Sequence, residues 1–173
     1  ENPSAVMLKG QAYFTLAGND IRLEALDGGI GILSQDLDKI CWLNDHPVTR
    51  VLTIENLTVF HRWSEPGTLT VYLGGYHNHV KRQFLMALYR NFPEAVYLHF
   101  GDIDCGGFWI YWDLCQKTGI PFETYKMDAD ILARFRKYVK PLGANDRKRL
   151  TQMMKEERLL PIAPVYEQML AWN

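Results

Sequence analysis

The chain has 173 residues, of which 47% are apolar and 13% aromatic, so it can bury the core of one domain and is not a disordered segment. Its net charge of −1 points to neither an acidic nor a basic partner, and no apolar run resembles a signal peptide or reaches membrane-spanning length. The three cysteines show no CxxC spacing, which argues against a structural zinc site and suits the reducing cytoplasm, where we expect the protein to act. Because the chain begins without methionine and ends abruptly, we expect it to be a piece of a longer protein.

The N-terminal segment, residues 1–47, is predicted to contain a small β-hairpin. Two short runs rich in strand-forming residues occupy residues 12–26 and flank the turn sequence GND. Residues 33–43 then predict a short helix, with Ser34 or Asp36 as its N-cap.

Strands and helices alternate over residues 48–130, which we predict to be the main domain. The predicted strands are apolar runs at residues 50–55, 69–75, 95–100 and 121–127. The predicted helices lie at residues 80–91, 107–119, 129–139 and 145–160. Such alternation predicts an α/β fold with a mostly parallel sheet and helices on both faces. Residues 131–173 are predicted to form a helical, basic extension of the same domain.

The charge of the chain is unevenly distributed. Residues 134–158 hold nine basic and three acidic side chains, a net charge of +6, so the rest of the chain carries −7. A basic tail on an acidic body can indicate a polyanionic partner. A solvated helical face explains the same residues more simply, and this segment alone favours that explanation.

Acidic residues follow two of the predicted strands. Glu55 ends the strand at residues 50–55, and Asp102 and Asp104 come just after the strand at residues 95–100. Ligands of parallel sheets bind beyond the carboxyl ends of the strands, so these carboxylates converge on one rim if the two strands are neighbours. Carboxylates that close need a cation, and a cluster of oxygen ligands suits Mg²⁺ or Mn²⁺, which can activate a phosphodiester. We therefore predict that all three residues are metal ligands and catalytic residues.

Several other residues are weaker candidates for contact with phosphate or DNA. They share a position near the same rim of the predicted sheet: His61, His77, Lys81, Arg82 and Lys126. A solvated loop or a polar helix entry explains most of them as well as a phosphate contact does. Asn56 can orient Glu55 or a metal-bound water, or it can serve a turn.

Two motifs resemble a known family. The phrase "VLTIENLTVF", followed some fifty residues later by "GDIDCGG", resembles a Toprim domain, with a Glu after one strand and a DxD after another. These motifs are similar to those of the Toprim domain in the topoisomerase VI A subunit lineage. They are more similar to those of the C-terminal domain of the JetD family, the nuclease subunit of the Wadjet systems that defend prokaryotes against plasmids. The likeness is specific over residues 48–130.

The resemblance implies a function and partners. It implies hydrolytic cleavage of double-stranded plasmid DNA with Mg²⁺ or Mn²⁺, through Glu55, Asp102 and Asp104. It also implies association with the SMC-like subunits of a Wadjet complex, a homodimer in the full-length protein, and no membrane.

Two other classes of function remain open on the sequence. One is a phosphatase-like phosphotransferase with a DxD nucleophile, although such a motif normally follows the first strand, which leaves Glu55 without a role. The other is a non-catalytic module that binds DNA and uses its carboxylates to hold a structural ion.

Overall fold

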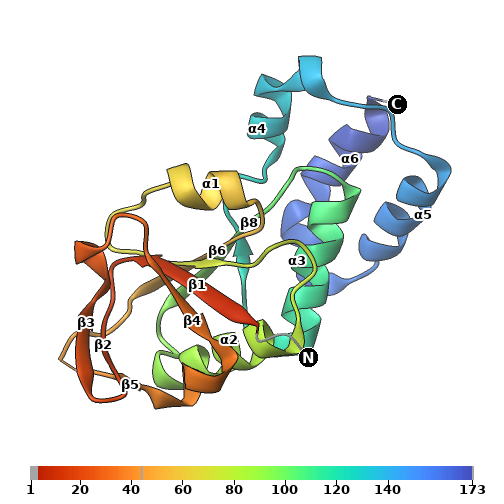
Figure 1. The fold of residues 1–173 in the computed structure, drawn as a ribbon. Helices are drawn as coiled ribbons and strands as arrows, with labels where there is room; N and C mark the ends of the chain where they lie inside the picture. Colours follow the sequence, from red (N-terminus) through yellow and green to blue (C-terminus); the bar gives the residue numbers. More distant parts are fainter. Residues whose placement is uncertain (1–3, 44, 173) are drawn as a thin grey trace.

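A central sheet of six strands organises the protein, whose computed structural model describes residues 4–43 and 45–172 (Figure 1). The strands lie in the order β4 (Ile30–Leu33), β1 (Ala5–Gly10), β7 (Leu69–Tyr72), β6 (Arg50–Ile54), β8 (Val96–Phe100) and β9 (Glu123–Thr124). The pairs β7–β6, β6–β8 and β8–β9 are parallel, whereas β1 runs antiparallel to both β4 and β7. The predicted α/β class with a mostly parallel sheet is confirmed.

A second, smaller sheet comes from the N-terminal part of the chain. It is antiparallel, with the order β3 (Asn19–Arg22), β2 (Tyr13–Leu16) and β5 (Ile40–Trp42). The predicted hairpin is therefore confirmed as β2–β3. The helix predicted over residues 33–43 is wrong in its second half, because residues 40–42 pair with β2 as a strand. Its first half is a 3₁₀ helix over residues 34–39, and neither Ser34 nor Asp36 caps it as predicted, since its N-cap is Leu33 without a side-chain hydrogen bond.

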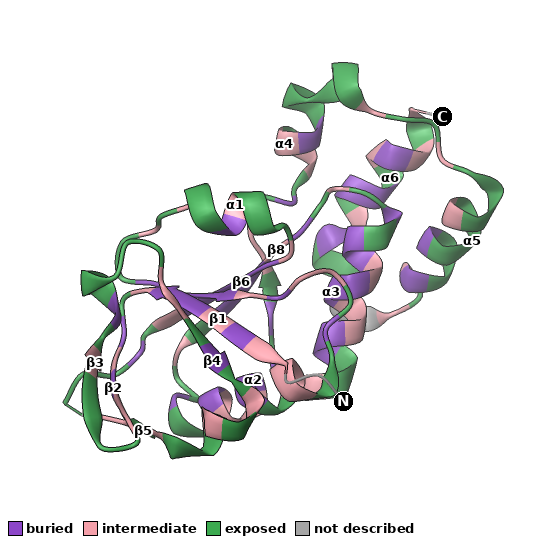
Figure 2. Cartoon of the chain, in the orientation of Figure 1, coloured by how far each residue is buried: buried purple, intermediate pink, exposed green. Residues whose placement is uncertain are grey.

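Helices cover both faces of the central sheet. The helix α1 (Leu57–Arg62) packs Phe60 against Leu52, Ile54 and Leu98 on one face. The helices α2 (His79–Asn91) and α3 (Cys105–Thr118) pack on the other face, where the larger core lies. Figure 2 shows this burial along the strands and along α3. Alternate side chains of β6 and β8 thus enter two cores, which explains why both strands read as nearly continuous apolar runs.

The C-terminal part wraps α3 from the outside. Its helices are α4 (Ala129–Arg134), α5 (Ala144–Met153) and α6 (Ala163–Ala171), of which α5 and α6 pack against α3 (Figure 1). The helices predicted over residues 129–139 and 145–160 are too long, since α4 and α5 end early and 3₁₀ turns follow them. Pro161 has no N–H to donate, which suits the irregular turn that precedes α6.

Two features of this architecture place the functional residues. The parallel strands β6 and β8 are neighbours in register, so both end at the same edge of the sheet. The helix α3 starts at that edge and ends at its C-cap Gly119, which has a φ of 69°. No helix in the described part of the chain is long and apolar enough to span a membrane.

Candidate active site

Glu55 extends β6 by one residue beyond the regular strand. Its backbone N–H donates to the carbonyl oxygen of Phe100 at 3.1 Å, which ties it to the end of β8. The side chain is half-buried, and its Oε2 is shielded from solvent without a hydrogen-bond partner among the described residues. Burial raises the pKa of the Glu55 carboxyl group, and the negative charges of Asp102 and Asp104 raise it further, against a hydrogen bond from the Asp102 backbone that lowers it.

Asp102 and Asp104 leave the end of β8 and are both exposed. The pKa of the Asp102 carboxyl group is raised, first by partial burial and then by the negative charge of Asp104. The Oδ1 atom of Asp104 accepts a hydrogen bond from the N–H of Gly107 at 2.8 Å and so caps α3. Asp104 therefore has a structural task that uses one oxygen and leaves the other available.

The tight turn between β8 and α3 depends on Gly107. A Cβ atom on this residue would lie 2.2 Å from the carbonyl oxygen of Asp102, closer than any real contact. The absence of that atom lets the first turn of α3 pack directly on the DxD motif. The free N–H groups of the helix N-terminus therefore lie beside the carboxylates, where they favour an anionic group.

The negative charges of Asp102 and Asp104 are near enough to raise the pKa of Glu55, and that of Asp104 is near enough to raise the pKa of Asp102. As they stand, however, no three His, Cys, Asp or Glu side chains within residues 4–43 and 45–172 surround one point closely enough to hold a metal ion. Asn56 does not add a ligand, because its Oδ1 accepts hydrogen bonds from Thr58 and Val59 as the cap of α1. Its turn role is thus the one that the structure supports.

A cavity of about 620 Å³ opens beside the DxD motif. Its lining includes Asp102, Asp104 and Gly106, together with Tyr138 and Lys140 from the segment after α4. Tyr138 exposes 67% of its surface and Phe135, which also lines the cavity, 53%. The cavity therefore combines carboxylates, exposed aromatic rings and a cationic side chain.

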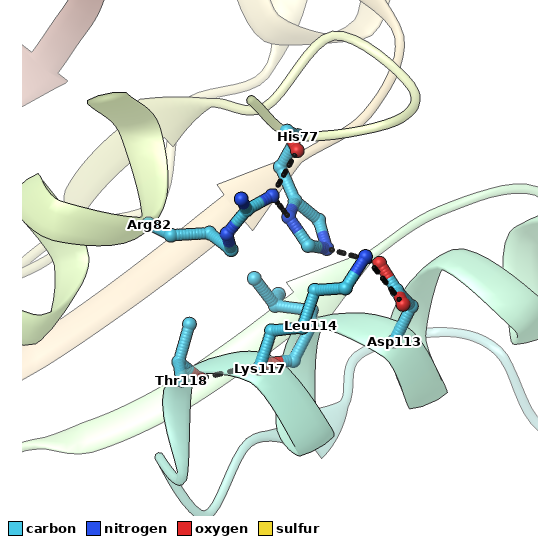
Figure 3. Close-up of polar contacts among 6 residues, drawn as sticks. All are labelled: His77, Arg82, Asp113, Leu114, Lys117 and Thr118. Carbon is cyan, nitrogen blue, oxygen red and sulfur yellow. Dashed lines mark hydrogen bonds and ion pairs between the residues drawn. The ribbon is translucent and has the colours of Figure 1, made fainter. Parts of the chain in front are cut away.

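Two of the weaker candidates, His77 and Arg82, point toward α3 (Figure 3). The side chain of His77 is 0% exposed, and its Nε2 lies 3.4 Å from Asp113, which also pairs with Lys117 at 2.9 Å. Burial lowers the pKa of His77, and the Asp113 carboxylate partly opposes this. Arg82 donates to the carbonyl oxygen of His77 at 2.7 Å. This cluster joins the loop before α2 to α3, so His77 presents no imidazole to solvent.

The other weak candidates are spread over the molecule. Lys81 donates to the carbonyl oxygen of Leu73 at 2.7 Å, and burial lowers its pKa. His61 is exposed at the end of α1. Lys126 is exposed and adopts a φ of 55°, with its Nζ 4.4 Å from the ring centroid of Trp63. Of these three, His61 and Lys126 keep a side chain that a phosphate can reach.

One polar residue that the sequence prediction passed over lies directly under the carboxylates. His99 belongs to β8 and is fully buried, and its Nδ1 lies 3.0 Å from Thr53 Oγ1 on β6. The sequence did contain a signal for this residue. His99 lies in the run AVYLHF, whose other side chains are apolar except for the weakly acidic Tyr97. Its environment could not be foreseen, because it depends on the pairing of two strands far apart in the chain.

Comparison with known proteins gives a consistent result. The family model described as "Wadjet protein JetD, C-terminal" matches residues 14–170. The Wadjet protein JetD of Bacillus cereus (strain Q1) is 28% identical over 165 residues, which cover 91% of this chain and 39% of that protein. The chain thus spans about two fifths of the length of that relative.

Proposed function

The chain belongs to the JetD C-terminal family, and from this premise we propose that it is the catalytic part of a divalent-metal-dependent DNA endonuclease. The observation that carries the proposal is the set of carboxylates at the ends of β6 and β8. Glu55 and Asp102 both have a raised pKa, because burial and neighbouring carboxylates disfavour their negative charges when no cation is bound. A cation offsets these charges, and phosphodiester chemistry commonly uses one.

The donor atoms fit Mg²⁺ or Mn²⁺. All are carboxylate oxygens, the hard ligands that these ions prefer. Glu55 Oε2 has no partner among the described residues, and Asp104 keeps one oxygen outside its helix cap. Asp102 and Asp104 would bind the ion directly, and Glu55 would share it or act as general base and acid. When bound, the ion would polarise the phosphodiester and stabilise the leaving oxygen.

The surroundings suit a DNA backbone. The N-terminus of α3 offers free N–H groups to a phosphate beside the carboxylates. The cavity brings Lys140 to the same place, and the exposed residues Arg136 and Lys137 stand close to it in the chain. Contacts of this kind are independent of sequence and supply most of the affinity of proteins for DNA.

The partners proposed for the chain follow from its family. The relative carries the name of a Wadjet protein, and we extend to this chain a place in a Wadjet complex with SMC-like subunits. We also extend to it double-stranded plasmid DNA as substrate, a homodimeric full-length protein and a Toprim-like arrangement of the site. The part of the relative that this chain does not span would supply further DNA contacts.

A non-catalytic role is the second candidate, and one observation favours it. Asp104 already caps α3, so the DxD motif has a structural use without chemistry. In that case the carboxylates would hold an ion only to stabilise the domain. The phosphatase-like alternative has no comparable support, because the DxD motif follows β8 and leaves Glu55 on β6 without a role.

Nicking of supercoiled plasmid by the full-length protein, with Mg²⁺ or Mn²⁺ and with a chelator, tests the proposal. Asp104→Asn keeps a good helix cap and removes the charge, so we expect it to fold as well as the parent and to lose at least about 10²-fold in cleavage. Asp104→Ala should lose cleavage and, in addition, about 0.5–2 kcal/mol of stability because the cap is gone.

Two results would contradict this proposal. A parent protein that binds DNA but never nicks it with either metal would favour the non-catalytic module. Full cleavage by Asp104→Asn would remove that residue from the chemistry. Calorimetry of Mn²⁺ binding to the same two variants separates the loss of a ligand from the loss of the fold.

A further inference from the structure

A buried polar pair connects β6 to β8 beneath the carboxylates. The imidazole of His99 has 0% exposure, and its Nδ1 lies 3.0 Å from the hydroxyl oxygen of Thr53. The ring stacks on Tyr111 with the centroids 5.9 Å apart and the planes 29° from parallel, so its orientation is held from one side. Burial lowers the pKa of His99 to about 3, and the nearby His77 contributes, so the imidazole is neutral in the folded protein at neutral pH.

The other ring nitrogen faces the site. Neither His99 Nε2 nor Glu55 Oε2 has a hydrogen-bond partner among the described residues, and both atoms are shielded from solvent. Both atoms lie close to the point that a Cβ atom would occupy at Gly101, which has no side chain. That Cβ atom would lie 2.7 Å from Glu55 Oε2 and 2.9 Å from His99 Nε2. The two atoms are therefore no farther apart than the sum of these distances, which is within reach of one bridging water.

We infer that His99 is a positioning residue for Glu55, whose carboxyl group it orients through a hydrogen bond from Nε2, made directly or through one water. The inference rests on the proposed function, since it concerns how Glu55 is held for DNA cleavage. Two buried polar atoms without partners are costly, and one shared hydrogen bond satisfies both. Groups that hold a catalytic or metal-binding side chain in this way commonly matter nearly as much as the side chain itself.

The direction of the hydrogen bonds distinguishes this role from a purely structural one. The Thr53 hydroxyl carries one hydrogen and has two acceptors in reach, the carbonyl oxygen of Leu98 at 3.1 Å and His99 Nδ1 at 3.0 Å. If Thr53 donates to Nδ1, the neutral imidazole carries its hydrogen on Nε2 and can donate to Glu55. If Thr53 donates to Leu98 instead, His99 donates from Nδ1, and Nε2 has nothing to offer a carboxylate.

The first experiment reads the tautomer of His99 without any activity measurement. Nitrogen-15 NMR of the full-length, metal-free protein labelled at histidine distinguishes the two neutral forms, with the His99→Gln spectrum assigning the signal. We expect the hydrogen on Nε2. A hydrogen on Nδ1 would overturn the inference, and His99 would then serve only to link β8 to β6 by its hydrogen bond with Thr53.

The second experiment measures plasmid nicking by His99 variants of the full-length protein. His99→Phe keeps a flat ring against Tyr111 without a donor, and we expect kcat to fall about 10–100-fold with KM for DNA unchanged. His99→Gln places an amide N–H close to the position of Nε2 and should recover part of that loss. The control His46→Phe changes an exposed histidine outside the site and should cleave like the parent.

The outcomes keep the two proposals apart. A folded His99→Phe protein that cleaves at the parental rate would overturn the positioning role. If that variant does not fold, the kcat of His99→Gln and the tautomer of the parent decide instead. A parent protein that does not cleave DNA would overturn the proposed function, whereas the tautomer would still decide whether His99 donates toward Glu55.

Discussion

At Glu55, burial and the negative charge of neighbouring carboxylates both raise the pKa of the side chain. Its pKa is raised in the folded protein, mainly by burial, so the folded state holds a proton more tightly than the unfolded chain does. Stability therefore falls as the pH rises from the unfolded pKa, about 4.3, through the folded pKa, and the full cost applies above it. We predict that metal-free Glu55→Gln is more stable than the parent at pH 7 and loses this advantage below about pH 4. The gain should stay below about 1 kcal/mol, because a half-exposed carboxylate is screened by water.

Urea denaturation at pH 7 and pH 4, with a chelator present, measures this difference. Glu94→Gln is the matched control, since Glu94 is an exposed glutamate in the turn before β8 and its neutralisation should give no such gain. A Glu55→Gln protein that is less stable than the parent at pH 7 would mean that the carboxylate makes a stabilising contact in the absence of metal.

At the scale of elements, the close approach of α3 to the end of β8 decides the shape of the site. A Cβ atom on Gly107 would lie 2.2 Å from the backbone oxygen of Asp102, whereas one on Gly106 would meet only the side-chain Oδ1 of Asp104, at 3.3 Å. We predict that Gly107→Ala loses about 1–3 kcal/mol of stability, because the start of α3 must move away from the DxD motif. Gly106→Ala should be neutral or gain up to about 1 kcal/mol, since alanine favours helix.

The two alanine variants control for each other in one set of denaturation curves. They lie one residue apart at the start of the same helix, and each adds one methyl group. Equal stability of the two variants would show that α3 is free to shift, and that the turn does not hold the carboxylates against the helix N-terminus.

For the whole molecule, the division of charge is the property that bears on DNA. The segment of residues 134–158 carries +6 on a body of −7, and α5 presents Arg147 and Lys148 to solvent. If these side chains contact phosphates, we predict that Arg147→Gln/Lys148→Gln weakens DNA binding at low salt. The slope of log K against log salt should become shallower by about 0.9 for each phosphate that the variant no longer neutralises.

Fluorescence anisotropy of labelled duplex DNA over a salt series measures that slope. The control Arg22→Gln/Arg90→Gln removes two exposed positive charges outside the segment, with the same change in net charge. Equal slopes for the two double variants would assign the basic segment to a solvated helical face, the simpler explanation that its sequence also allows.

Much of the fold was predictable because its signals are local. Strands β6, β7 and β8 are short apolar runs between turn residues, and α2 shows its apolar face at a helical period, so each was placed within a few residues. The sequence prediction of one shared rim depended on β6 and β8 being neighbours, and the structure shows that the two strands pair in parallel. From that pairing alone, Glu55 and the DxD motif are expected at one edge, since the carboxyl ends of parallel strands coincide.

The sequence by itself determined the alternation of strands and helices, the acidic residues that follow β6 and β8, and the motifs of the family. The tertiary structure decided what depends on segments distant in the chain. It paired β1 with β7, and it directed His77 and Arg82 toward α3. It also ended the C-terminal helices earlier than predicted. It also placed Glu55 Oε2 and His99 Nε2, both without a partner among the described residues, close to the same position at Gly101. Hydrogen bonding and burial of a polar side chain depend on which groups the fold brings against it, and no pattern along the chain encodes those neighbours.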